Sequence, residues 1–197
     1  MNNEEKLALA PNEVLCATIG KIYSAETGEA SSSHISYIIK RASLSMPVVL
    51  CALYLAVSAR EKAAQYIGSL REEMEAHIFQ REELQKKIDT CLQLCENSAT
   101  LFSICLIIAS KYLVDRVYIN RTWANILMMD KSQINAYERI LLHVFDHNID
   151  ISETSLKFVL QKVHRFSYVH PPKKEGKLLR TLKNLAACLF KRPDAKH

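Results

Sequence analysis

The sequence predicts an all-helical protein, on the basis of its turn residues, its apolar periodicity and its apolar content. Between Val48 and His170 there is no proline and only one glycine, Gly68. Sheets joined by tight turns need these two residue types repeatedly, whereas helices joined by short polar links do not. With 49% hydrophobic residues over 197 positions, the chain can also bury a substantial core.

The first two helices are predicted over residues 13–24 and 34–43. In each, apolar residues recur at helical spacing along one side. Ser33 is a candidate cap for the second helix, because its hydroxyl can accept a hydrogen bond from the first turn.

Two further helices are apolar around almost their whole circumference. One follows a candidate cap at Ser45 and runs through residues 51–57, and the other follows Asn97 and covers residues 99–114. Both apolar stretches are shorter than the ~18 residues of a membrane span. We therefore expect helices buried inside a bundle and no membrane-spanning segment.

Residues 68–96 differ in character, because charged and apolar residues alternate along them. This pattern predicts a solvent-facing amphipathic helix with a break near Phe79. The segment forms either a solvated hairpin or a contact surface for a partner. Its apolar repeat covers too few heptads to require a coiled-coil partner.

The C-terminal half continues with helices. Asp130, followed by Gln133 three residues later, is typical of a capping box and predicts a helix up to about His147. Its inward stripe consists of Ile134, Tyr137, Leu141, Val144 and Phe145. Ser152 begins another predicted helix, and a basic amphipathic helix is predicted over residues 176–192.

The net charge of +5 is unevenly distributed. Residues 171–197 hold eight basic and two acidic residues, a net +6, which leaves −1 for residues 1–170. A fold that binds nucleic acid usually carries a basic face, so we do not expect the body to bind DNA or RNA. The leucines of the tail helix favour docking on the rest of the chain, with an acidic membrane surface or nucleic acid as alternatives.

No catalytic or metal-binding motif stands out. The sequence has no glycine-rich phosphate loop, no nucleophile elbow and no convincing carboxylate pair, so we expect neither an enzyme nor a small-molecule substrate. His143 and His147 have metal-ligand spacing but no third ligand nearby, and Cys91 and Cys95 are better explained by interior packing. We therefore predict no metal and no cofactor.

Two charged residues occupy positions where apolar residues are expected. Glu138 falls within the apolar stripe of its helix, and Lys111 lies in the last turn of a helix that is apolar all round. An unpaired buried charge costs on the order of several kcal/mol. Either both residues lie at the edge of the core and meet a partner protein, or Lys111 pairs locally with Asp115 and Glu138 is solvated.

The segments Ala109-Ser-Lys-Tyr-Leu-Val-Asp-Arg116 and Tyr118-Ile-Asn-Arg-Thr-Trp-Ala124, followed by Asn135-Ala-Tyr-Glu-Arg-Ile-Leu-Leu142, resemble the cyclin box. They are most similar to the phosphate-signalling cyclins of fungi and the P/U-type cyclins of plants and protists. The chain departs from that pattern after Ala124, where Asn125-Ile-Leu-Met128 replaces the family's usual Lys-Val-Gly-Gly.

The resemblance implies a single five-helix cyclin box over residues 34–166, with residues 68–96 as a charged helical insertion. Residues 1–33 then flank the box, and residues 167–197 form a basic tail.

In the family, a Lys/Glu pair at the positions of Lys111 and Glu138 binds a cyclin-dependent protein kinase. Leu113 and Leu142 would add apolar area beside this pair. The resemblance thus implies a kinase-activating subunit of a heterodimer in the nucleus or cytoplasm, with a cyclin-fold adaptor or transcription-factor-like box as the alternative.

Overall fold

The computed structural model describes residues 13–27 and 32–149, together with several positions between 152 and 163. All regular secondary structure in these residues is helical, which confirms the predicted all-helical class for this part of the chain. The predicted tail helix over residues 176–192 lies outside the described residues.

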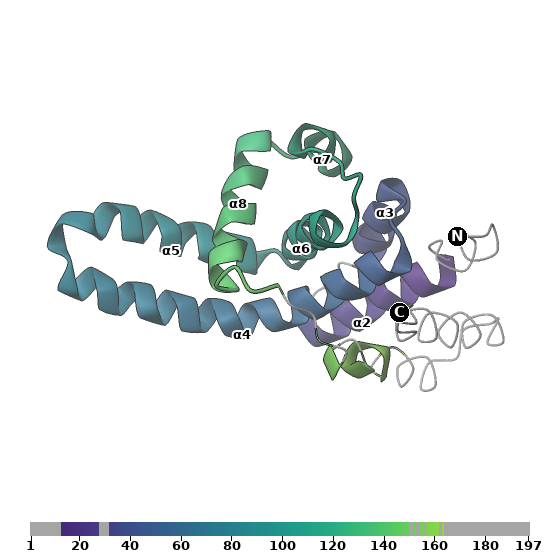
Figure 1. Cartoon of the computed structure of the whole chain (residues 1–197), viewed down its shortest axis with the longest axis horizontal. Coiled ribbons are helices and arrows are strands. Elements are labelled where there is room, and N and C mark those ends of the chain that lie inside the picture. The colour runs from purple at the N-terminus through teal and green to yellow at the C-terminus, as the bar shows by residue number, and fades with distance from the viewer. Residues whose placement is uncertain are drawn as a thin grey trace, which may run out of the picture.

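Figure 1 shows how the helices are arranged. In chain order they are α2 (Glu13–Thr27), α3 (Ser32–Ala42), α4 (Met46–Ala76), the short 3-10 helix η1 (Ile78–Gln80), α5 (Arg81–Glu96), α6 (Ser98–Leu113), α7 (Asn120–Leu127) and α8 (Lys131–Val144).

Helix α6 lies at the centre of the molecule. Its side chains from Leu101 to Ser110 are all buried, because α3, α4, α5 and α8 pack around it (Figure 1). The Asn97 side chain accepts a hydrogen bond of 2.9 Å from the backbone N–H of Thr100 and caps the helix. The prediction of a second helix buried on all sides is therefore confirmed, as is its cap.

Helices α4 and α5 form a long hairpin that extends to one side of the bundle (Figure 1). The predicted break near Phe79 is confirmed, since the chain turns between His77 and Gln80. A separate charged helix beginning at Gly68 was expected, but α4 passes through Gly68 without interruption.

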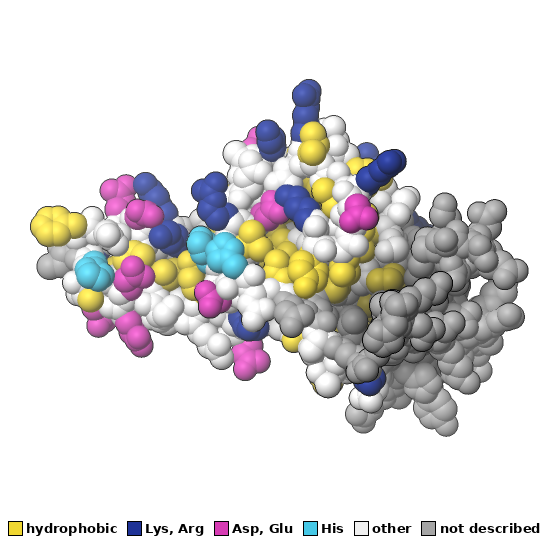
Figure 2. Space-filling model, viewed as in Figure 1, with side chains coloured by type: hydrophobic (Ala, Val, Ile, Leu, Met, Phe, Trp, Pro, Cys, Tyr) yellow, Lys and Arg dark blue, Asp and Glu magenta, His cyan; other side chains and the backbone are white. Residues whose placement is uncertain are grey.

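The hairpin is only partly solvent-facing. Helix α5 buries Leu84, Ile88, Cys91 and Leu94 and packs against α4, α6 and α8. Acidic and basic side chains both lie on the surface of the hairpin, with the acidic ones more numerous in this view (Figure 2). These outer charges explain the amphipathic pattern of the sequence, and the inner apolar residues hold the two helices together.

Three predicted caps differ in detail. Helix α3 starts at Ser32, so Ser33 lies inside its first turn. Ser45 occupies the N-cap position of α4 but makes no side-chain hydrogen bond there. Asp130 caps α8 by accepting a 2.6 Å hydrogen bond from the backbone N–H of Ser132, whereas Gln133 donates to Tyr137 and does not close a capping box.

The link from α6 to α8 contains the single tryptophan. Trp123 is completely buried, and the Tyr118 ring packs edge-on against it with centroids 5.9 Å apart. Helix α7 ends at Leu127, and the next residue, Met128, has a left-handed backbone (φ 55°) and an exposed side chain. The turn where the cyclin pattern has two glycines is thus made here by a non-glycine residue in a glycine-like conformation.

Among the described helices, none alone has the length and apolar content of a membrane span. Helices α5 and α6 reach both criteria only when taken together, and the chain bends by 105° between them.

Candidate functional site

The two unexpected charges of the sequence meet where α6 and α8 approach each other. Lys111 Nζ lies 2.5 Å from Glu138 Oε1, and the two side chains are 33% and 14% exposed. The local alternative, in which Lys111 pairs with Asp115, is therefore wrong. The pair joins residues 27 positions apart in the sequence and fixes the end of α6 against the middle of α8.

Asn120, the first residue of α7, completes the network. Its Nδ2 donates to Glu138 Oε2 and to Asn135 Oδ1, both at 2.7 Å. Both carboxylate oxygens of Glu138 are therefore engaged, one by α6 and the other by α7. The sequence analysis did not single out Asn120, although this residue is part of the quoted Tyr-x-Asn motif.

The two predicted leucines lie beside this network on the same two helices. Leu142 is one helical turn after Glu138 on α8 and is partly buried against the core. Leu113 is the last residue of α6 and is 45% exposed. Leu113 is therefore open to a partner, whereas Leu142 offers only part of its side chain.

Apolar side chains remain exposed along the link that follows Lys111. Five of them, all within residues 112–119, are between 38% and 65% exposed: Tyr112, Leu113, Val117, Tyr118 and Ile119. A single exposed apolar residue is ordinary, but here five lie within eight consecutive positions, with the exposed charges of Asp115 and Arg116 among them. We call residues 111–120 together with Glu138 and Leu142 the α6–α8 face.

The contacts among Lys111, Glu138 and Asn120 are polar, although apolar side chains could also join these helices. Replacing a partly buried ion pair by well-packed apolar residues is often neutral or stabilising, so such a pair is weak evidence for a purely structural role. Here a third of the Lys111 side chain remains exposed to solvent. Lys111 and Glu138 thus lie as a fixed charged pair beside the exposed apolar side chains of residues 112–119.

The structure also shows where the histidine pair and the cysteines of the sequence analysis lie. His143 and His147 lie in contact, with His147 Nε2 3.3 Å from His143 Nδ1. Within the described residues, no group of three or more potential metal ligands comes together. Burial raises the pKa of the Cys51 thiol to about 12. The thiols of Cys51, Cys91, Cys95 and Cys105 are free. Cys91 is buried as expected, whereas Cys95 is only partly buried.

Comparison with protein-family models, with curated proteins and with solved structures gives no match for this chain. The resemblance of residues 34–166 to a cyclin box therefore stays a prediction.

Proposed function

We propose that this chain is a cyclin-type regulatory subunit that binds and activates a cyclin-dependent protein kinase through the α6–α8 face. The observation that carries the proposal is the Lys111–Glu138 ion pair, which two separate helices hold at 2.5 Å beside an exposed apolar surface. In this proposal α3, α4, α6, α7 and α8 are the five helices of the box.

The composition of the face supports a protein partner. Its five exposed apolar residues between positions 112 and 119 offer aromatic and aliphatic side chains that a partner can cover. Aromatic residues surrounded by weaker contacts often carry most of the binding energy of an interface. Lys111 and Glu138 would then fix the orientation of the partner, since an ion pair covered by an interface adds specificity.

The proposed mechanism is a shift of conformational population. A kinase that rarely occupies its active arrangement becomes active when a second protein binds that arrangement more tightly than the inactive one. The face suits this role because α6, α7 and α8 are tied together through Glu138 and Asn120. A surface tied in this way can hold a mobile helix of the kinase without itself deforming.

The test is a pull-down from the source cells with the full chain as bait, followed by identification of cyclin-dependent kinases by mass spectrometry. The informative variant is Lys111→Ala/Glu138→Ala. Its matched control is Glu82→Ala/Lys86→Ala, which removes an exposed ion pair of 3.0 Å on the hairpin. Both variants are first checked for folding by circular dichroism.

We expect the wild type and the control variant to recover the kinase, and the Lys111/Glu138 variant to recover at least about tenfold less, since truncated hot-spot residues cost ~2 kcal/mol or more. Equal recovery of the kinase by all three proteins would show that the contact does not depend on Lys111 and Glu138. If none of them recovered a kinase, the adaptor function would replace the proposal.

A further inference from the structure

The outer part of the α4–α5 hairpin, residues 68–96, is the most acidic part of the described structure. It holds seven acidic and four basic residues, a net charge of −3. Residues 32–67, with four basic and one acidic residue, carry a net +3, and residues 97–149, with five basic and four acidic residues, carry a net +1. The hairpin is therefore the described surface that attracts a cationic segment most strongly (Figure 2).

Three carboxylates lie near the free end of the hairpin, at the C-terminal end of α4. Glu72, Glu73 and Glu75 are all exposed, and none of them forms an ion pair with another residue that the structure describes. The last turn of α4 contains no basic residue. Because the C-terminal end of a helix carries a partial negative charge, it favours cations and disfavours carboxylates. A cationic segment from elsewhere would therefore stabilise this end of α4.

An aromatic side chain lies at the turn beside these carboxylates. Phe79, in the short helix η1 that joins α4 to α5, is fully exposed. Lysine and arginine side chains bind the face of an aromatic ring, and aliphatic side chains can cover it. The free end of the hairpin thus offers contacts to a segment that is both basic and apolar.

The chain contains such a segment in residues 171–197, which lie outside the described residues. This tail holds eight basic and two acidic residues, a net +6, and its leucines recur at helical spacing. The charges of the hairpin and the tail are opposite in sign. Because both belong to one chain, they meet at an effective concentration that is set by the connecting segment and not by the protein concentration.

The tail is also long enough to reach the free end of the hairpin. Val163 is buried in the core, and 34 residues of the sequence follow it. A segment of this length can extend over ~110 Å. Helix α4, with 31 residues, is only ~46 Å long.

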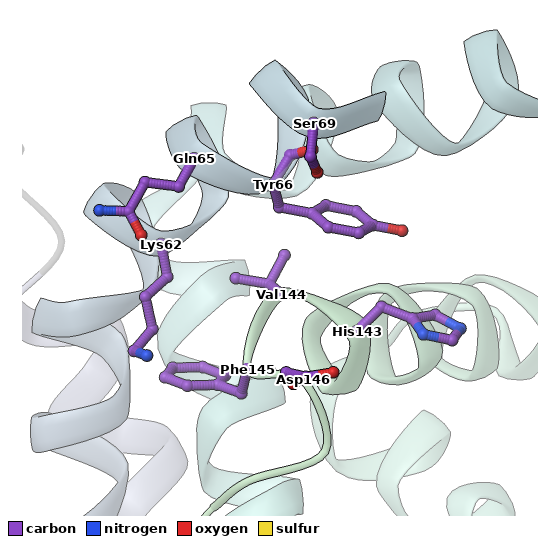
Figure 3. A pocket seen from close by; sticks show the side chains of 8 residues that line it. All are labelled: Lys62, Gln65, Tyr66, Ser69, His143, Val144, Phe145 and Asp146. Carbon is purple, nitrogen blue, oxygen red and sulfur yellow. The ribbon is translucent and has the colours of Figure 1, made fainter. Parts of the chain in front are cut away.

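Two other surfaces suit a basic segment less well. In the α6–α8 face, Lys111 and Arg116 balance the charges of Asp115 and Glu138. A pocket between α4 and the C-terminal end of α8 is formed by residues 62–69 and 143–146 (Figure 3). Its lining contains one lysine and one aspartate, so it carries no negative charge that would attract the tail.

We propose that the basic tail, residues 171–197, docks on the free end of the α4–α5 hairpin of its own chain. Its lysines and arginines contact Glu72, Glu73 and Glu75, and its apolar side chains cover Phe79. This contact is independent of the proposed kinase contact, because residues 68–96 share no position with the α6–α8 face.

The test is carbodiimide cross-linking of the full chain at low and at high salt, followed by peptide mass spectrometry. The reagent joins a lysine amine directly to a carboxylate, so it reports only groups that are in contact. Glu82 and Lys86, which form an ion pair of 3.0 Å on α5, provide the internal control.

Three variants are compared with the wild type. All of the substituted hairpin residues are exposed, so folding should be retained, and circular dichroism checks it. The hairpin variant carries Glu72→Lys, Glu73→Lys and Glu75→Lys. The tail variant carries Lys173→Glu, Lys174→Glu and Lys177→Glu. The third protein combines all six substitutions and so exchanges the charges of the two segments.

In the wild type at low salt, we expect cross-links that join tail lysines to Glu72, Glu73 and Glu75. Their yield should fall at least about fivefold in about 0.5 M NaCl, because salt screens exposed charges. The hairpin variant and the tail variant should each lose tail–hairpin cross-links to a similar extent, and the combined variant should regain them. The Glu82–Lys86 cross-link should form in all four proteins.

Three outcomes overturn the proposal. Tail lysines joined only to carboxylates outside the hairpin would mean that the tail docks elsewhere. Cross-links between labelled and unlabelled chains, in a mixture of ¹⁵N-labelled and unlabelled protein, would mean that the hairpin binds the tail of a second copy. A yield of tail–hairpin cross-links that neither salt nor charge reversal changes, or the absence of such cross-links from the wild type, would mean that charge does not hold the tail on the hairpin.

Discussion

At the scale of single residues, the Glu138 carboxylate connects more of the structure than any other group of the α6–α8 face. One of its oxygens is paired with Lys111, and the other accepts a hydrogen bond from Asn120. The Lys111 side chain, by contrast, is 33% exposed and has Glu138 as its ion-pair partner. The two side chains should therefore differ in what they contribute to stability, although they form one ion pair.

We predict that Glu138→Ala lowers the free energy of unfolding by ~1–3 kcal/mol, because it removes a partner from both Lys111 and Asn120. Lys111→Ala should cost no more than ~1 kcal/mol, as is usual for a partly exposed ion pair. Urea unfolding followed by circular dichroism measures both values. A larger loss for Lys111→Ala than for Glu138→Ala would show that the network is connected differently.

Four of the cysteines, Cys51, Cys91, Cys95 and Cys105, should differ in reactivity. A hydrogen bond from Cys91 and the charge of Arg60 lower the pKa of the Cys95 thiol. Burial raises the pKa of Cys51 and of Cys105, and the hydrogen bond to Cys95 together with burial raises that of Cys91. Because the thiolate is the reactive form, Cys95 should react first.

We predict that iodoacetamide at pH 7.5 alkylates Cys95 before Cys51, Cys91 or Cys105 in the folded protein. Peptide mass spectrometry over a time course measures the order, with unfolded protein as the control in which all four react. Modification of Cys51 or Cys105 ahead of Cys95 would contradict the burial described above.

The sequence analysis found Lys111 and Glu138 at this scale, because each is a charge inside a regular apolar pattern. It did not find Asn120, because a residue in a link between helices has no periodic pattern against which it stands out. Its two alternatives were contact of both charges with a partner protein, or a Lys111–Asp115 pair with a solvated Glu138, and it did not consider that Lys111 and Glu138 pair with each other. Only the packing of α6 against α8 decides between a neighbour four residues away and one on another helix.

At the scale of helices, the α4–α5 hairpin shows how packing overrides a local signal. Gly68 favours a helix end, yet α4 continues through it because the residues on either side, Ile67 and Leu70, are buried against the core. The break comes instead between His77 and Gln80, at the place predicted near Phe79.

Gly68→Ala should stabilise the protein by ~0.5–1 kcal/mol, because glycine in a helix interior is less favourable than alanine. A Cβ atom at this position would meet no other atom within 4 Å, so the substitution adds no clash. Thermal unfolding measures the change as a higher Tm. Ser69→Ala, at the next exposed position, is the control for a general effect of alanine, and a lower Tm for Gly68→Ala would show that α4 is interrupted in solution.

The contact between α4 and α8 should weaken in mild acid. The pKa of His143 lies below its ordinary value of 6.5 in the folded protein, so below pH 6.5 the unfolded chain binds more protons at this residue than the folded chain does. The free energy of unfolding should therefore fall as the pH drops from 7 to 5. The fall should be smaller in His143→Gln, measured by urea unfolding at each pH. An identical pH dependence in the two proteins would exclude this residue as a cause.

At the scale of the whole molecule, the class of fold was predictable because a single physical pattern determines it. Ten consecutive side chains of α6 are buried, and the lack of turn residues from Val48 onward leaves helices as the only elements that can cover them. The pocket between α4 and α8 was not predictable. Its walls come from positions 62–69 and 143–146, and no local pattern shows that these two segments meet.

The proposed function requires that binding of the α6–α8 face changes the activity of another protein. The most direct measurement is the phosphoryl-transfer rate of the purified kinase, with saturating wild-type chain, with Lys111→Ala/Glu138→Ala and without addition. If the kinase alone is active in only ~0.1–10% of molecules, the wild type should raise its rate about 10- to 1,000-fold, and the variant should lose most of this gain at equal concentration. An unchanged rate with the wild type, or equal activation by the variant, would contradict the proposal.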